Sequence, residues 1–578
     1  MLAHQISTMY VPNVGVLLLC LALTTAASDR PHIILIVADD LGFNDVGFHG
    51  STQIPTPNID ALAYSGLILN NYYVQPICTP SRSALMTGKH PIHTGLNHDV
   101  IYGPQPYGLP LGERLLPQHL GQLGYISHLV GKWHLGMAIK EMTPTYRGFA
   151  SHFGYWTGHK DYYDHSSQEA PGYWGYDMRR NMSVAHDCYG KYTTDLFTDE
   201  AVKVINQHNT SKPLFLYLAH LAVHSGNPYA ALQAPEEVVQ KFSYIKDEQR
   251  RKFAAMLWKL DESVGRVVEV LNDKQMLHNS VILFTTDNGG PAADFNKNAA
   301  SNWPLRGVKA AMWEGGVRGA GLLWSPKILN PGRVSQQMLH ITDWLPTLVS
   351  AAGGDGSSIQ SLDGIDMWKT LTEGRDSPRK EFLVNYDPIL DGAAVRFGDW
   401  KLLYNPQGYG HHWDGWFGPS GRNETAPETS LKVIIEMVLN STVAKAVRAA
   451  APDAYQNLTS VRKDAEIHCG PIPANATKVC NVTTSPCLFN ILRDPCEYTD
   501  VAASHPDVMA ILKARLQDYI DTAVPPRNKP WDPSANPKYW GYTWNNWLDY
   551  PPPVGLQVDG SVTQTAFAND IYGDMRPE

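Results

Sequence analysis

Short, continuously apolar segments recur along the chain, and they constrain its fold more than any other feature. The clearest is Pro31–Ala38 (PHIILIVA). A run of this length without polar alternation fits a strand that is buried on both faces, as in parallel sheets. Similar runs lie at Ile126–Val130, Leu214–Ala219, Val281–Thr285 and Ala320–Trp324.

Segments with helical periodicity separate these runs. Apolar residues recur at helix spacing in Lys252–Leu271 and again in Asp343–Ala352. Strands that alternate with helices predict an α/β fold, with a large, mixed but mostly parallel sheet between helical layers. In such sheets, ligand sites form beyond the carboxyl ends of the strands. The residues that directly follow each run are therefore the first candidates for function.

The pattern of predicted strands and helices changes near residue 390. Phe397–Tyr404 and Cys487–Leu492 resemble strands and His505–Asp521 a helix, which predicts a smaller C-terminal α+β domain. From about Val524 the chain is rich in Pro, Trp, Tyr and Asn, which is typical of an irregular wrapping tail. We expect a signal peptide at 1–27, a large first domain at 28–390, a smaller domain with a glycosylated insertion at 391–523, and the tail at 524–578.

The N-terminus has the features of a secretory signal peptide. Val14–Leu23 is apolar but too short to span a bilayer comfortably, and small residues follow it up to Ala27. No later segment is apolar enough for stable membrane insertion. Glycosylation sequons agree with export, and we expect N-glycans on several of them. The sequons are at Asn181, Asn209, Asn423, Asn440, Asn457, Asn475 and Asn481.

Four cysteines near the C-terminus lie close enough to form two disulfides, which again suits an exported protein. They are Cys469, Cys480, Cys487 and Cys496. Three pairings are possible. We favour Cys469–Cys480 and Cys487–Cys496 because these are nearest neighbours in the sequence.

The formal net charge of −9, without any Lys/Arg-rich run, argues against nucleic acid as a partner. An acidic protein also repels an anionic substrate at long range. Such a substrate would have to be captured by cations placed at the site itself.

Acidic side chains directly follow two of the apolar runs. Asp39 and Asp40 follow the first, and Asp287 and Asn288 follow VILFTT. Each motif alone more simply forms a helix cap or a turn. Together they supply three carboxylates and one amide oxygen from strand ends, an all-oxygen set that suits a hard cation such as calcium or magnesium. Zinc would call for His or Cys ligands nearby, and the sequence offers no such set.

The most specific motif is CTPSR, which begins at Cys78 and continues as SALMTGKHP. Pro80 suits the first turn of a helix, so Cys78 is expected at the positive helix end, where an anionic group is stabilised. The alternative is a buried or disulfide-bonded cysteine in a Pro-Ser turn. The pattern C-x-P-S-R followed by T-G resembles the signature of the sulfatase family, whose cysteine is oxidised to formylglycine in the endoplasmic reticulum.

The resemblance extends from Pro31 to about Ala523. The stretches VADDLG, TPNIDALA, VGKWHLG, GHKDYYDH, TTDNGG and NWPLRGVKAAMWEGGVRG are similar to the arylsulfatase B branch of this family. The resemblance implies an alkaline-phosphatase-like α/β core with a smaller C-terminal domain. It also implies a single calcium ion, whose ligands would be Asp39, Asp40, Asp287, Asn288 and the oxidised side chain of Cys78.

The resemblance implies a covalent mechanism. One hydroxyl of the hydrated aldehyde would attack sulfur and expel the alcohol, and the second would let the sulfated intermediate collapse and release sulfate. Arg82 would anchor the diol. Lys132 and His134 would bind sulfate oxygens and assist proton removal, while His224 and Lys309 would contact the sulfate, with His224 as proton donor to the leaving oxygen. These cations would form a local positive pocket in an acidic protein.

Two other functions compete with this interpretation. A phosphoesterase on the same core would use a Ser or Thr nucleophile and two zinc ions. An inactive, secreted sulfatase-like binding protein would have lost the nucleophile or a metal ligand, and the motifs above retain both. The expected substrate is a sulfated small molecule or glycan, such as N-acetylgalactosamine 4-sulfate in glycosaminoglycans or an aryl or glycoside sulfate. The resemblance also implies the formylglycine-generating enzyme as a biosynthetic partner, and a secreted or lysosomal location.

Overall fold

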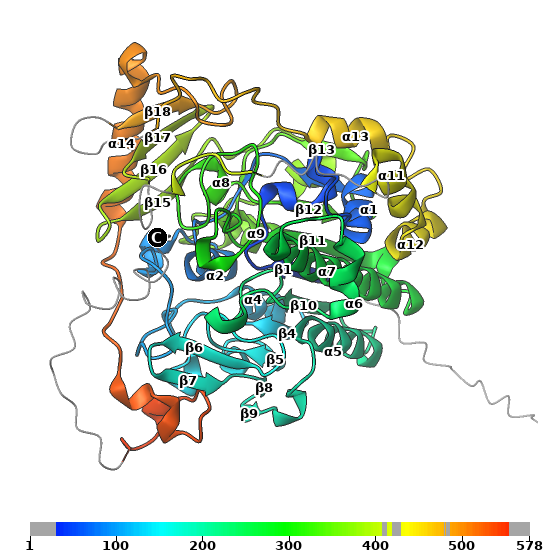
Figure 1. The fold of residues 1–578 in the computed structure, drawn as a ribbon, viewed down its shortest axis with the longest axis vertical. Coiled ribbons are helices and arrows are strands. Elements are labelled where there is room, and N and C mark those ends of the chain that lie inside the picture. The colour runs from blue at the N-terminus through cyan, green and yellow to red at the C-terminus, as the bar shows by residue number, and fades with distance from the viewer. Residues whose placement is uncertain (1–29, 407–412, 419–428, 479, 481–485, 554–578) are drawn as a thin grey trace, which may run out of the picture.

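A ten-stranded sheet forms the centre of the computed structural model, which describes residues 30–406, 413–418, 429–478, 480 and 486–553 (Figure 1). The strand order is β13-β2-β12-β11-β1-β10-β4-β5-β8-β9. The five strands from β11 to β5 in this order run parallel, and antiparallel pairs flank them on both sides. The mixed, mostly parallel sheet confirms the predicted fold. Its strands are β1 (His32–Ala38), β2 (Leu67–Leu69), β4 (Ile126–Lys132), β5 (Ser151–Tyr155), β8 (Arg179–Arg180), β9 (Ser183–Val184), β10 (Leu214–Ala219), β11 (Ser280–Thr286), β12 (Gly321–Trp324) and β13 (Arg333–Ser335).

Helices cover both faces of this sheet because its central strands are apolar on both sides. In β1, Ile34 and Ile36 point into one buried cluster and Ile33 and Leu35 into the other. The first cluster is covered by α1 (Pro57–Ser65), α5 (Thr193–Gln207), α6 (Glu236–Val239) and α7 (Glu248–Asp273). The second is covered by α2 (Cys78–Thr87), α4 (Leu116–Gln122), α9 (Trp344–Ala351) and α10 (Trp368–Glu373). All five apolar runs predicted as strands are strands of this sheet.

A second, four-stranded antiparallel sheet lies beside the first. Its order is β15 (Glu381–Asp387), β16 (Gly392–Phe397), β17 (Trp400–Tyr404) and β18 (Cys487–Asn490). The long helix α14 (Pro506–Thr522) packs on one face, and the other face meets the large domain around α8 (Glu314–Val317). Because β15 pairs with β16, this sheet begins earlier than the expected boundary at residue 391.

The described residues between β17 and β18 include three α-helices that cross to the large domain. They are α11 (Leu431–Asn440), α12 (Thr442–Ala450) and α13 (Leu458–Ala465), and α11 and α12 pack on α1, with α12 also on α7 (Figure 1). Apolar residues such as Val438 and Val447 join the same buried cluster as α7. The insertion therefore thickens one helical layer of the large domain.

The chain after α14 runs along the molecule to a two-stranded hairpin of β6 (Ser166–Ala170) and β7 (Tyr173–Tyr176) (Figure 1). Trp544 is fully buried there, and its indole nitrogen donates to the carbonyl of Ser167. The backbone N–H of Tyr176 donates to the carbonyl of Tyr542. These contacts hold the C-terminal tail against the hairpin. The remaining short elements are β3 (Tyr72–Tyr73), β14 (Leu339–His340) and α3 (Pro91–Thr94).

The disulfide pairing that we favoured is wrong. The structure joins Cys469 to Cys496 and Cys480 to Cys487. The two bonds lie in different apolar clusters, and β18 begins at Cys487, so the strand leads the chain away from that residue before Cys496 is reached. The pairing of the cysteines thus follows the apolar cluster in which each one is buried and not their proximity in the sequence.

The predicted signal peptide lies outside the described residues. Within the described part, no helix is both long and apolar enough to cross a bilayer. The sequons at Asn423 and Asn481 also lie outside it, whereas the other five asparagines are all exposed.

Candidate active site

The predicted site residues come from neighbouring strands of the central sheet. Asp39 follows β1, Asp287 follows β11, and Lys132 ends β4. His224 lies in the loop after β10. Because β11, β1, β10 and β4 are adjacent and parallel, their carboxyl ends meet at one edge, and these side chains converge there.

Three buried carboxylates and three buried cations pair with one another at this edge. Nζ of Lys132 lies 2.6 Å from Oδ2 of Asp39, Nζ of Lys309 lies 2.8 Å from both carboxylate oxygens of Asp40, and Nη2 of Arg82 lies 2.8 Å from Oδ2 of Asp287. All six side chains are at most 3% exposed. An unpaired charge at this depth would cost several kcal/mol, so the pairs hold one another in place.

Cys78 is the first residue of α2, and its thiol faces these carboxylates. Its Sγ lies 3.7 Å from Oδ1 of Asp39. Burial raises the pKa of the Cys78 thiol far above its usual range, despite the nearby lysines. The thiol is therefore protonated at physiological pH and is a weak nucleophile as it stands. A reactive group at this position calls for chemical modification of the side chain.

The arrangement fits a hard divalent cation. Ligand atoms of Asp39, Asp40, Cys78 and His224 all lie within 4.8 Å of one another. Oδ1 of Asn288 is buried and has no hydrogen-bond partner among the described residues, while its Nδ2 donates to Oδ1 of Asp40 at 2.8 Å. A carbonyl oxygen left bare beside carboxylates is the donor type that calcium prefers.

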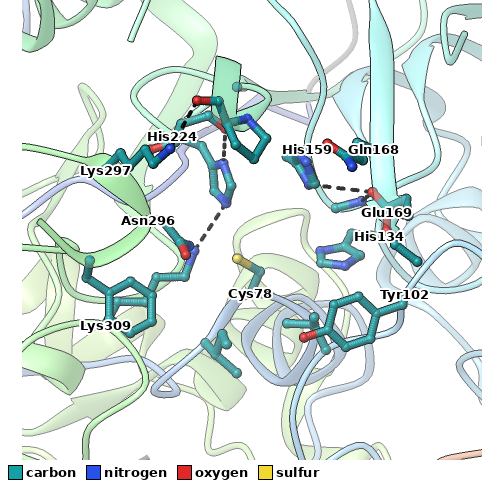
Figure 2. A pocket seen from close by; sticks show the side chains of 18 of the residues that line it. Cys78, Tyr102, His134, His159, Gln168, Glu169, His224, Asn296, Lys297 and Lys309 are labelled. Atoms are coloured by element: carbon teal, nitrogen blue, oxygen red, sulfur yellow. Dashed lines mark hydrogen bonds and ion pairs between the residues drawn. The ribbon is translucent and has the colours of Figure 1, made fainter. Parts of the chain in front are cut away.

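A cavity of about 330 Å³ opens above Cys78. Figure 2 shows the sulfur between His134 on one side and the Lys309–His224 pair on the other. Arg82 and Lys132 are not among the residues that line this cavity. They pair with Asp287 and Asp39 away from the cavity, whereas Lys309, His134 and His224 line it.

The two histidines are neutral, and each presents a different nitrogen. Burial and the nearby lysines hold the pKa of His134 and of His224 well below the usual range. Nε2 of His134 donates to the carbonyl of Ile101 at 3.0 Å, which leaves its buried Nδ1 without a partner among the described residues. Nδ1 of His224 donates to the carbonyl of Ser225 at 2.6 Å, so its Nε2 accepts from Lys309 at 3.1 Å.

Lys309 carries the proton of this pair. Burial alone would lower the pKa of Lys309, but the adjacent Asp40, with Cys78 and Asp39, raises it above its usual range. The ammonium therefore stays charged while it contacts Nε2 of His224.

The cavity also has a wall that the motifs did not identify. His159, Gln168 and Glu169 line it from the β5–β6 loop and from β6, and Tyr102 lines it from the loop after α3 (Figure 2). Nδ1 of His159 lies 3.5 Å from Oε1 of Glu169. The only sequence signal for this wall is the polar stretch GHKDYYDH, in which Lys160 points away from the cavity and donates to Thr193 at 2.7 Å.

Known proteins match this chain along most of its length. The model of the family described as Sulfatase matches residues 31–354. Arylsulfatase J of Mus musculus is 41% identical over 530 residues, which cover 90% of this chain and 81% of that protein. N-acetylgalactosamine-6-sulfatase of Homo sapiens is 32% identical over 393 residues, which cover 66% of this chain and 72% of that protein.

Solved structures agree with the sequence matches. The structure of Ps i-CgsB in complex with k-i-k-neocarrahexaose has a TM-score of 0.65 and 27% identity, and covers 86% of this chain and 94% of that one. The similarity to the arylsulfatase B branch stays a prediction. At the level of the family, the matches and the converged site agree: this chain belongs to the sulfatase family and is a sulfuric ester hydrolase.

Proposed function

We propose that this chain hydrolyses sulfate monoesters of the arylsulfatase type, with a formylglycine hydrate made from Cys78 as nucleophile and one calcium ion. The observation that carries the proposal is that three features lie together at one edge of the central sheet. Cys78 opens α2, the bare Oδ1 of Asn288 lies with the carboxylates, and Lys309 faces the cavity. The calcium ligands would be Asp39, Asp40, Asp287, Asn288 and the modified side chain of residue 78.

The charges at the site support binding of an anion once a metal is present. Three carboxylates and three cations give a formal net charge of zero. A divalent cation would raise this charge to +2. Calcium would thereby supply the positive charge that stabilises sulfate oxygens and the developing oxyanion. The acidic surface of the protein does not oppose capture at this short range.

The two neutral histidines suit opposite proton transfers. Nδ1 of His134 has a free lone pair, so it can accept the proton that a hydroxyl of residue 78 must lose. Lys309 holds its proton beside Nε2 of His224, so this pair can supply a proton to the leaving oxygen. The hydrated aldehyde would provide one hydroxyl for attack on sulfur and a second whose deprotonation releases sulfate.

Turnover of a chromogenic aryl sulfate tests this proposal. The parent protein, secreted from a eukaryotic host, is compared with Cys78→Ala and Cys78→Ser, all in calcium. Cys78→Ser keeps one hydroxyl but cannot provide the second, so both variants should be inactive while they are secreted as well as the parent. Mass spectrometry of residue 78 should find the aldehyde in the parent. Full activity of either variant would contradict the mechanism.

The broader setting follows from the same features. The substrate would be a sulfated glycan, such as N-acetylgalactosamine 4-sulfate in glycosaminoglycans, or a small aryl or glycoside sulfate. The two disulfides and the exposed sequons support passage through the secretory pathway, with N-glycans and a secreted or lysosomal destination. The formylglycine-generating enzyme would act on the chain there.

A further inference from the structure

Two exposed aromatic side chains stack on each other next to residues that line the cavity. The rings of Trp174 and Tyr229 are 5.6 Å apart and inclined by 26°. Trp174 is 37% and Tyr229 57% exposed. Large aromatic rings left open to water are candidates for ligand contact. Trp174 belongs to β7 and Tyr229 to the loop after β10, so the pair links the hairpin to a loop, and other residues of both segments line the cavity.

The structure holds both rings in fixed positions. Oη of Tyr229 lies 2.9 Å from Oδ2 of Asp161 and 2.7 Å from Oδ2 of Asp164, so its one proton is held between two carboxylates. Trp174 is the cross-strand partner of Gln168 in the β6–β7 hairpin. A rigid aromatic surface loses little conformational entropy when a ligand covers it.

The aromatic pair continues the wall of the cavity. Gln168 lines the cavity, and directly paired residues of a hairpin lie on the same face, so Trp174 faces the same side. Pro171, at the hairpin turn, and Pro228, next to Tyr229, also line the cavity.

A cation lies at the same rim. Lys297 is exposed, lines the cavity, and donates to the carbonyl of Pro228 at 3.3 Å. Figure 2 shows Lys297 and Asn296 on the side of the cavity opposite Gln168. The rim thus combines an aromatic surface, amide groups and one positive charge.

We propose that Trp174 and Tyr229, with Lys297 and Gln168, form a subsite for a second sugar ring of a sulfated glycan whose sulfate ester lies at Cys78. A pyranose ring packs its C–H face on an aromatic ring, while its hydroxyl and acidic groups bind amides and a cation. A purely apolar ligand would displace water from Lys297 and Gln168 without offering hydrogen bonds in return. The cavity of about 330 Å³ lies at the small end of ligand sites, so a longer substrate leaves it across this rim.

This inference rests on the proposed function of the adjoining cavity, and binding separates the two. Binding is measured by calorimetry in calcium on the Cys78→Ala protein, which cannot turn over its ligand. The probes are tetrasaccharides of chondroitin 4-sulfate, dermatan sulfate and κ-carrageenan. Trp174→Ala and Tyr229→Ala should each weaken binding of at least one probe by about fivefold to tenfold, the scale of one aromatic contact. Tyr229→Phe keeps the ring but loses the contacts of Oη with Asp161 and Asp164, so its binding should be weaker than that of the parent and tighter than that of Tyr229→Ala.

Two controls complete the test. Tyr189→Ala removes an exposed tyrosine that neither stacks on Trp174 nor adjoins a residue lining the cavity, and should change nothing. Lys297→Gln should weaken binding and reduce its dependence on salt. The inference is overturned if no tetrasaccharide distinguishes the parent from Trp174→Ala and Tyr229→Ala. Hydrolysis of an aryl sulfate by the Cys78 protein reports separately on the proposed function, because so small a substrate does not reach the aromatic pair.

Discussion

Replacing Lys401 by methionine would leave two buried carboxylates without the cation they share. Lys401, on β17, is fully buried, and its Nζ lies 3.0 Å from Glu314 and 2.9 Å from Glu497. Glu314 retains an ion pair with Arg318 at 3.5 Å, so removal of the Lys401 cation destabilises mainly the buried carboxylate of Glu497. Removing one partner of a buried ion pair costs about 3–5 kcal/mol. For a chain of 578 residues that unfolds as one unit, this lowers the melting temperature by about 3–4 °C.

Lys401→Met should also alter the active site. Glu314 begins α8, and the next two glycines of this helix pack against the turn that carries Asp287 and Asn288. The backbone N–H of Gly289 donates to the carbonyl of Gly316 at 2.8 Å, and a Cβ on Gly289 would lie 1.9 Å from the carbonyl oxygen of Gly315. We therefore expect Lys401→Met to weaken calcium binding as well as stability.

Thermal melts of Lys401→Met and of the double variant Lys401→Met/Glu497→Gln test this reasoning. The second change removes the uncompensated charge and should restore more than half of the lost stability. Burial, with the nearby Glu314, raises the pKa of Glu497 to about 7. Lys401 lowers this pKa in the parent, so Glu497 of Lys401→Met takes up its proton at a higher pH, and the defect relative to the parent should shrink as pH falls from about 9 to about 7. A defect below 1 °C, or one that the double variant does not repair, would refute the reasoning.

Three further predictions concern the metal and the disulfides. Asp287→Ala removes a calcium ligand and the acceptor of Arg82, so turnover should fall at least about 100-fold and bound calcium should decrease; metal analysis with unchanged calcium would contradict the ligand assignment. Chelation should abolish turnover, and calcium rather than zinc should restore it; recovery with zinc alone would favour the phosphoesterase alternative. By loop length, loss of Cys469–Cys496 should cost about 3.5 kcal/mol and loss of Cys480–Cys487 about 2.5 kcal/mol, because the sequence separations are 27 and 7 residues; denaturant unfolding that reverses this order would argue against the entropic account.

The strands of the core were predictable because apolar runs such as LFLYLA are buried on both faces and need no partner to be recognised. Their polar ends were predictable for the same reason, which placed Asp39 and Asp287 together. The four-stranded sheet was less clear. Phe397–Tyr404 was expected as one strand, but Gly398 has a φ of +54° and begins a turn that divides the segment between β16 and β17.

What the sequence could not provide are contacts between distant segments. Nothing near Lys401 indicates its partners, which lie 87 and 96 positions away in the chain. The proposed sugar subsite also depends on a contact between distant segments, since Trp174 stacks on Tyr229 only in the folded chain. The helices α11, α12 and α13 of the sequon-rich insertion also escaped detection, because their apolar faces are buried largely against distant elements of the large domain, such as α1.

The burial of Cys78 limits the time during biosynthesis in which another enzyme can reach this residue. Only 2% of this residue is exposed in the finished fold, so under the proposed function the enzyme that oxidises it would have to reach it before α2 is covered. Trp544, which fixes the hairpin of the cavity wall, is synthesised 466 residues later than Cys78. At about 5–20 residues per second, synthesis leaves roughly 25–95 s between the two. Under the proposed function, the late arrival of the tail would give the modifying enzyme a time window during biosynthesis, and a chain that closed early would emerge folded but without the proposed aldehyde.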